Sequence, residues 1–196
     1  MKRDVIKLPS RNLSFYSFEK DVETIVKKLF TENTYSEDLK RLLVINKKDC
    51  IDDRTSEVYR NITKDTTVAK LVENGYITTT PKIRFPEHEE IKSYIVISFD
   101  DFTLNDTNPE FRDCTISFDI ICHLDYWDIG NYRLRPLKIA GIIDSLLNNS
   151  KLSGIGTLNF LGCGQIQLDE NLAGYTLLYR AVHMTEGDDS IPPEEE

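Results

Sequence analysis

The spacing of apolar residues changes near Tyr76, and this change constrains the fold more than any other feature of the sequence. Before residue 76, apolar residues recur at intervals of three and four, which is typical of amphipathic helices. After it, apolar and polar residues mostly alternate, as they do in strands that are buried on one face. Helices followed by such strands predict an α+β fold, in which helices pack on one face of a mostly antiparallel sheet.

Residues 1–75 are expected to form a mainly helical N-terminal extension. Apolar stripes predict helices over residues 18–29, after Ser36, and at about 66–73. Ser36 is a plausible N-cap, because the two acids that follow it suit the positive end of a helix dipole. The polar stretch 46–63 between these helices predicts a loop.

Residues 76–185 are expected to follow the order strand, strand, helix, strand, strand. The clearest strand is 114–122, in which Cys114, Ile116, Phe118 and Ile120 share one face. Other strands are expected at 82–85, 93–99, 157–161, 165–168 and 175–184. The Asp- and Asn-rich stretch 100–113 predicts a long exposed connection. Pro136 suits the first turn of a helix that continues to Leu147.

Charge is concentrated at the C-terminal end. Of the net charge of −9, six acids without a base lie in residues 186–196, so the rest of the chain is nearly balanced. Residues 1–185 are therefore predicted to form a single domain, and 186–196 a disordered acidic tail. The absence of a basic patch disfavours sequence-specific nucleic-acid binding.

The sequence also lacks the signals of export and of membrane insertion. It contains no apolar run of about 18 residues, and its first residues are charged without a signal-peptide core. A cytoplasmic chain without a membrane partner is expected.

Motifs that carry catalysis or bind cofactors are missing from the sequence. It has no phosphate-binding loop, nucleophile elbow or zinc-binding helix, and Gly154-Ile155-Gly156 is interpreted as a turn. The cysteines lack the spacing of zinc ligands and are interpreted as packing residues: Cys50, Cys114, Cys122 and Cys163. We expect no enzyme active site, no cofactor and no metal.

One catalytic alternative involves the histidines. If the strands that contain His123 and His183 pair, the two side chains could approach each other, and Asp119 or Asp125 could complete a metal or acid–base cluster. His88 offers no such arrangement. The competing interpretation, ordinary histidines at strand ends or on the sheet surface, is favoured because no motif sets their spacing.

The only tryptophan lies in a polar turn rather than in a periodic pattern. Tyr126 and Trp127 lie between two acids, and Arg133 and Arg135 follow them before the last helix. Aromatic and arginine side chains carry much of the binding energy of protein interfaces. We therefore predict a subunit interface at these four residues, with a hydrophobic plug at the end of the sheet as the alternative for Trp127.

The C-terminal half resembles the neck proteins of tailed bacteriophages, most closely the tail-terminator or tail-completion group that joins head and tail. The resemblance covers TISFDIICH (115–123), YWDI (126–129), LRPLKIAGIIDSLLN (134–148), LSGIGTLNF (152–160) and GYTLLYRAVH (174–183).

This resemblance implies a non-catalytic structural subunit of a virion, present in the host cytoplasm during assembly. It implies a homo-oligomeric ring, often a hexamer, whose neighbours are portal, connector or tail proteins. It implies no cofactor and no metal. Two other functions remain open on the residues alone: a small-ligand or regulatory binding domain, and a hydrolase that uses Asp119, His123 and His183.

Overall fold

The computed structural model describes residues 18–31, 35–79, 92–104, 111–153 and 155–184. Its helices are α1 (Phe18–Phe30), α2 (Ser36–Val44), α3 (Glu57–Asp65), α4 (Val68–Glu73) and α5 (Arg135–Leu147), with a short 3-10 helix, η2 (Leu124–Tyr126). Its strands are β1 (Ile77–Thr78), β2 (Tyr94–Leu104), β3 (Phe111–His123), β4 (Lys151–Leu152), β5 (Gly156–Thr157), β6 (Asn159–Gln167) and β7 (Leu172–Met184).

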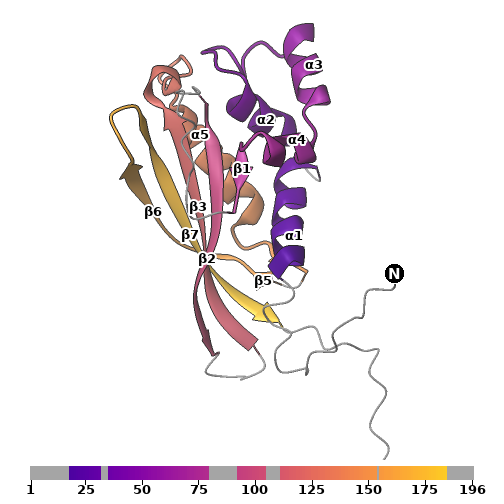
Figure 1. Ribbon diagram of the computed structural model, residues 1–196, viewed down its shortest axis with the longest axis vertical. Helices are drawn as coiled ribbons and strands as arrows, with labels where there is room; N and C mark the ends of the chain where they lie inside the picture. The colour runs from indigo at the N-terminus through magenta and orange to yellow at the C-terminus, as the bar shows by residue number, and fades with distance from the viewer. Residues whose placement is uncertain (1–17, 32–34, 80–91, 105–110, 154, 185–196) are drawn as a thin grey trace, which may run out of the picture.

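The main sheet has five strands in the order β1-β2-β3-β7-β6 (Figure 1). All neighbours are antiparallel except β1, which runs parallel to β2 over two residues. The small strands β4 and β5 form a separate antiparallel pair. The chain leaves the sheet after β3, forms α5, and returns through β6 to β7, which places β7 beside β3.

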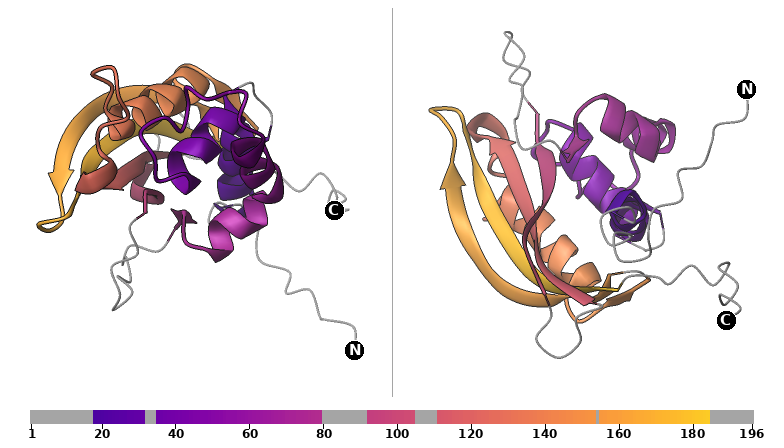
Figure 2. Two further views of the ribbon diagram at one scale, coloured as in Figure 1. Left: turned by 90° about the horizontal axis from the view of Figure 1, so that it is seen from above. Right: turned by 60° about the horizontal axis from the view of Figure 1, so that its bottom comes forward.

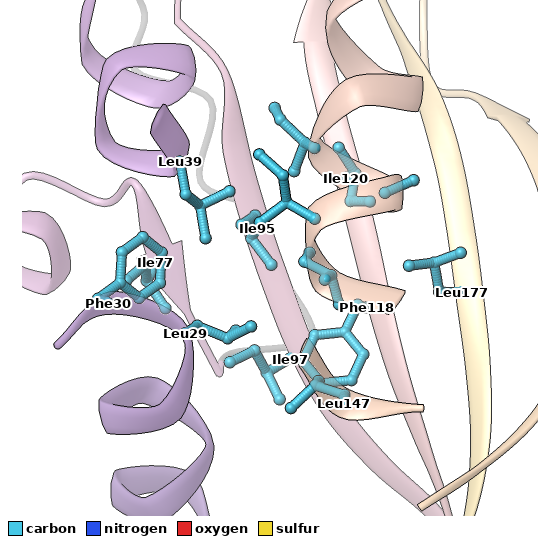
Figure 3. Close-up of a cluster of buried hydrophobic side chains, with 14 of the residues drawn as sticks. Leu29, Phe30, Leu39, Ile77, Ile95, Ile97, Phe118, Ile120, Leu147 and Leu177 are labelled. Carbon is cyan, nitrogen blue, oxygen red and sulfur yellow. The ribbon is translucent and has the colours of Figure 1, made fainter. Parts of the chain in front are cut away.

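The helices lie on one face of this curved sheet, with α5 packed against it (Figure 2). One core cluster joins them, and it includes Leu29 of α1, Leu39 of α2, Phe118 of β3 and Leu147 of α5, all completely buried (Figure 3). The predicted α+β class, with helices on one face of a mostly antiparallel sheet, is confirmed. The four N-terminal helices, α1 to α4, all contribute side chains to this core.

The predicted inward face of β3 is correct, since Cys114, Ile116, Phe118 and Ile120 all belong to the main core. The opposite face carries a second, smaller apolar cluster that the alternation did not predict, formed by Tyr94, Val96, Ile121 and Leu172.

The expected loop at 46–63 is wrong in its last part, where α3 begins. Ser56 caps this helix, because its hydroxyl accepts a hydrogen bond from the backbone N–H of Tyr59 (3.4 Å). Within α3 only Tyr59 and Thr63 are buried. The helix is polar on average, and this composition indicated a loop although its few apolar residues share one face.

The expected long connection at 100–113 is also wrong over most of its length. Strand β2 continues to Leu104 and β3 begins at Phe111, so acidic residues of the stretch belong to a long hairpin. An irregularity in pairing between Asp100 and Thr103, with Asp101 at φ 56°, allows β2 to continue despite its composition.

Near the C-terminus, the two strands expected at 157–161 and 165–168 are mainly one strand, β6, with irregular pairing between Phe160 and Gly162. The predicted strand at 82–85 and the predicted tail at 186–196 lie outside the described residues. No helix in the described part of the chain has the length and apolar character needed to span a membrane.

Candidate functional site

The segment between β3 and α5, residues 124–134, contains most of the predicted interface and is called the β3–α5 turn here. The first part of this turn is held by hydrogen bonds at both ends of η2. The Nδ1 atom of His123 accepts a hydrogen bond from the backbone N–H of Asp125 (3.2 Å), and the N–H of Trp127 donates to the carbonyl of Leu124 (3.1 Å). The side chain of Ile129 is completely buried in the main core and anchors the middle of the turn.

The tip of the turn is a tight hairpin. The backbone N–H of Arg133 donates to the carbonyl of Gly130 (3.0 Å), and that of Ile129 donates to the carbonyl of Arg133 (3.0 Å). The two central residues, Asn131 and Tyr132, have φ values of 51° and 59°. This left-handed pair is the geometry of a type I′ turn, which glycine and asparagine adopt easily and a bulky residue does not.

Tyr132 is the most exposed large hydrophobic residue of the described part of the chain, with a relative exposure of 105%. A non-glycine residue in the left-handed region costs roughly 1–2 kcal/mol. The turn therefore holds an aromatic ring in solvent on a backbone that is strained. Such strain persists only where surrounding contacts impose it, and it is enriched at functional sites. From the sequence, Trp127 was placed in a polar turn but Tyr132 was missed, although Gly130-Asn131 directly before it is a recognised turn signal.

Arg133 ties this tip to the N-terminal part of the chain. Its guanidinium makes two hydrogen bonds to the carboxylate of Asp52, one of them 2.8 Å long, and its Nε donates to the carbonyl of Gly130 (3.2 Å). The guanidinium lowers the pKa of the Asp52 carboxyl, first through these hydrogen bonds. Both side chains are partly exposed, so the pair restrains the geometry more than it adds to stability.

Arg135 was predicted to lie on a contact surface, and this prediction is wrong because its side chain is completely buried. Its guanidinium donates to four backbone carbonyls, those of Tyr126 (2.8 Å), Leu42, Ile45 (3.0 Å) and Lys47 (2.9 Å). Carbonyls at the C-terminal end of α2 carry the negative end of the helix dipole, which favours a cation there. Arg135 thus fastens the β3–α5 turn to α2.

Trp127 and Tyr126 are half-buried. The indole ring of Trp127 packs against the main core and faces the ring of Tyr175, with the two centroids 6.3 Å apart. This placement favours the plug interpretation for much of the Trp127 side chain. Both residues remain partly exposed in the turn that also carries Tyr132 and Arg133, so these four residues are the candidates for contact with another subunit.

The histidine cluster is excluded by strand register. In the β3–β7 ladder His123 lies opposite Leu172, whereas His183 lies opposite Arg112. His183 is therefore eleven residues, or about 36 Å, further along β7. Asp119 accepts a hydrogen bond from the Thr176 hydroxyl (2.6 Å), which gives its carboxylate a structural partner. The arrangement required for the proposed hydrolase does not form.

Three of the four cysteines are buried and one is exposed, Cys163. Burial raises the pKa of the Cys114 thiol to about 12 and that of the Cys122 thiol to about 11. Both thiols face the main core, as their interpretation as packing residues predicted. Cys163 departs from this interpretation because it lies on the edge strand β6.

Comparison with known proteins identifies one family. A chain of a solved structure described as "Virion of native gene transfer agent (GTA) particle" is 16% identical, with a TM-score of 0.41 over 64% of this chain and 90% of that chain. None of the curated proteins is similar to the chain. The model of the family described as YomW matches residues 36–181, well over half of the sequence, from the start of α2 into β7. The chain belongs to the YomW family.

Proposed function

We propose that the chain is a non-catalytic structural subunit of a virion, which forms a ring in the neck and joins or terminates the tail where it meets the head. The segments that resemble phage neck proteins supply most of β3, part of the β3–α5 turn, α5, most of the small pair β4 and β5, and most of β7. The resemblance therefore includes two adjacent inner strands of the main sheet and a helix that packs against them.

The observation that carries the proposal is the presentation of Tyr132. A strained, tightly bonded turn holds this ring in solvent, and Trp127 and Arg133 lie close to it in the chain. Tyrosine, tryptophan and arginine are the residues most enriched among interface hot spots. A rigid tip loses little entropy on binding, because its backbone is already ordered before contact.

The contact in a closed ring is heterologous, since one surface of each subunit meets a different surface of the next. The β3–α5 turn would supply one of these two surfaces. Its fixation by Asp52 and by the buried Arg135 would keep the tip in one orientation as subunits join.

Two substitutions of Tyr132 test the proposal. Tyr132→Asn removes the ring and suits the left-handed backbone, so it should leave the melting temperature unchanged or slightly raised. It should weaken subunit assembly by about tenfold or more, because truncating a hot spot costs about 2 kcal/mol. Tyr132→Phe keeps the ring and is the matched control.

The readout is the mass of the assembled protein, measured by light scattering on the chain alone and on its mixtures with portal and tail proteins of the same virion. Assembly that is lost in Tyr132→Asn and kept in Tyr132→Phe supports the proposal. Equal assembly by both variants and the unmodified chain would remove the β3–α5 turn from the contact.

A further inference from the structure

Strand β6 forms one edge of the main sheet, and its only strand partner among the described residues is β7 (Figure 1). Its nine residues, NFLGCGQIQ, contain no charge and no proline. Seven of the nine are exposed, including Phe160 at 41% and Leu161 at 55%. An added Cβ atom at Gly162 or Gly164 would meet nothing within 4 Å.

The direction of the free backbone groups follows from the turn that joins β6 to β7. The N–H of Leu168 donates to the carbonyl of Leu172 in β7 (2.9 Å). Because backbone groups alternate in direction along an antiparallel strand, those of Gly164 and Ile166 also face β7. The N–H and carbonyl groups of Cys163, Gln165 and Gln167 then face away from the sheet.

The other edge of the sheet is protected. Strand β1 pairs with Ile95 and Val96 of β2 and covers this part of the edge. Further along β2, the pairing with β3 is irregular after Asp100, and the carboxylates of Asp100 and Asp101 put two negative charges on the strand. Natural sheets prevent the pairing of an edge strand with another chain by covering the edge, by β-bulges and by charged side chains. In the part of the chain that the structure describes, strand β6 has none of these devices except the irregular pairing near Phe160, so it is the edge able to accept another strand.

We propose that β6 pairs with β6 of a second copy of this chain, antiparallel and about a two-fold axis, so that the two sheets become continuous. An uncharged strand is complementary to itself, since two copies meet without like-charge repulsion. A register centred on Gln165 pairs all three outward-facing residues, with Cys163 of each copy opposite Gln167 of the other. This contact goes beyond the proposed ring contact, because it is isologous and uses a different surface.

The test compares two substitutions at Gln165 in the full chain by sedimentation velocity. Gln165→Pro removes the outward N–H and leaves the bonds to β7 in place, so it should weaken the dimer at least about tenfold. Gln165→Thr keeps the N–H and should still dimerise. Circular dichroism and thermal melting check that each variant is folded.

A second measurement needs no variant. In the proposed register the two Cys163 residues are about 13 Å apart along the strands. Because the other three cysteines are buried, a bismaleimide of matching length should link two unmodified chains through Cys163 alone. A peptide map then identifies the linked residue.

A dimer that is lost in Gln165→Pro, kept in Gln165→Thr and linked through Cys163 supports the pairing. A chain that stays monomeric across a wide concentration range overturns it, as does a dimer that does not link through Cys163. An oligomer that disappears in Tyr132→Asn and persists in Gln165→Pro supports the proposed ring and overturns this pairing.

Discussion

At the scale of single residues, two neighbouring arginines with similar sequence surroundings have opposite structural roles. Arg133 forms a partly exposed ion pair with Asp52, whereas Arg135 is enclosed and bonded to backbone carbonyls. The sequence predicted both as contact residues because both precede a helix in a polar turn. Whether an arginine is buried depends on the distant chain that covers it, here residues 42–47, and local sequence does not contain this information.

The same substitution at the two positions should therefore have different effects. Arg135→Lys replaces a planar fork of donors by a single ammonium and leaves buried carbonyls without partners. We expect it to lower the free energy of unfolding by about 3 kcal/mol. Arg133→Lys should change the free energy by less than about 1 kcal/mol, because its pair with Asp52 is partly solvated. Urea denaturation of both variants gives the comparison, and equal losses would contradict the assigned roles.

At the scale of elements, the sequence predicted the segments with a strong apolar period correctly. It did not predict the helix and strand segments whose polar composition is typical of loops. Helix α5 and the core face of β3 were predicted because both have a clear apolar period. The end of β2 and the start of β3 were missed because the Asp- and Asn-rich composition of residues 100–113 indicates a loop, while the ladder with β7 supplies the bonds that keep β3 extended. The β3–α5 turn was located, but the left-handed Tyr132 was not expected there.

Two glycines of adjacent strands offer a test of how closely the sheet is packed. A Cβ atom added to Gly174 in β7 would lie 1.7 Å from the carbonyl oxygen of Ile120 in β3, which is backbone and cannot move aside cheaply. Gly174→Ala should cost about 1–3 kcal/mol or more. Gly164→Ala on β6 has open space and should be neutral or stabilising by up to about 1 kcal/mol. Thermal melting separates them, and a harmless Gly174→Ala would contradict the close approach of β7 to β3.

At the scale of the whole molecule, two separate surfaces are proposed to contact other subunits. The β3–α5 turn presents Tyr132 on a rigid tip, and β6 presents an uncharged edge with free backbone groups. A head-to-tail contact through the turn can close a ring, whereas a two-fold contact through β6 joins copies in pairs. The same chain would then have a paired form in solution and a ring form in the virion, each abolished by a different substitution.

The proposed role is tested most directly by the protein composition of purified virions, measured by quantitative mass spectrometry on particles from cells that carry this gene. If the chain is a neck or tail subunit, it should be present in a fixed and small number of copies per particle, as one ring requires. Particles from cells that carry the Tyr132→Asn variant should contain much less of it. Complete, infectious virions that lack the chain would contradict the account.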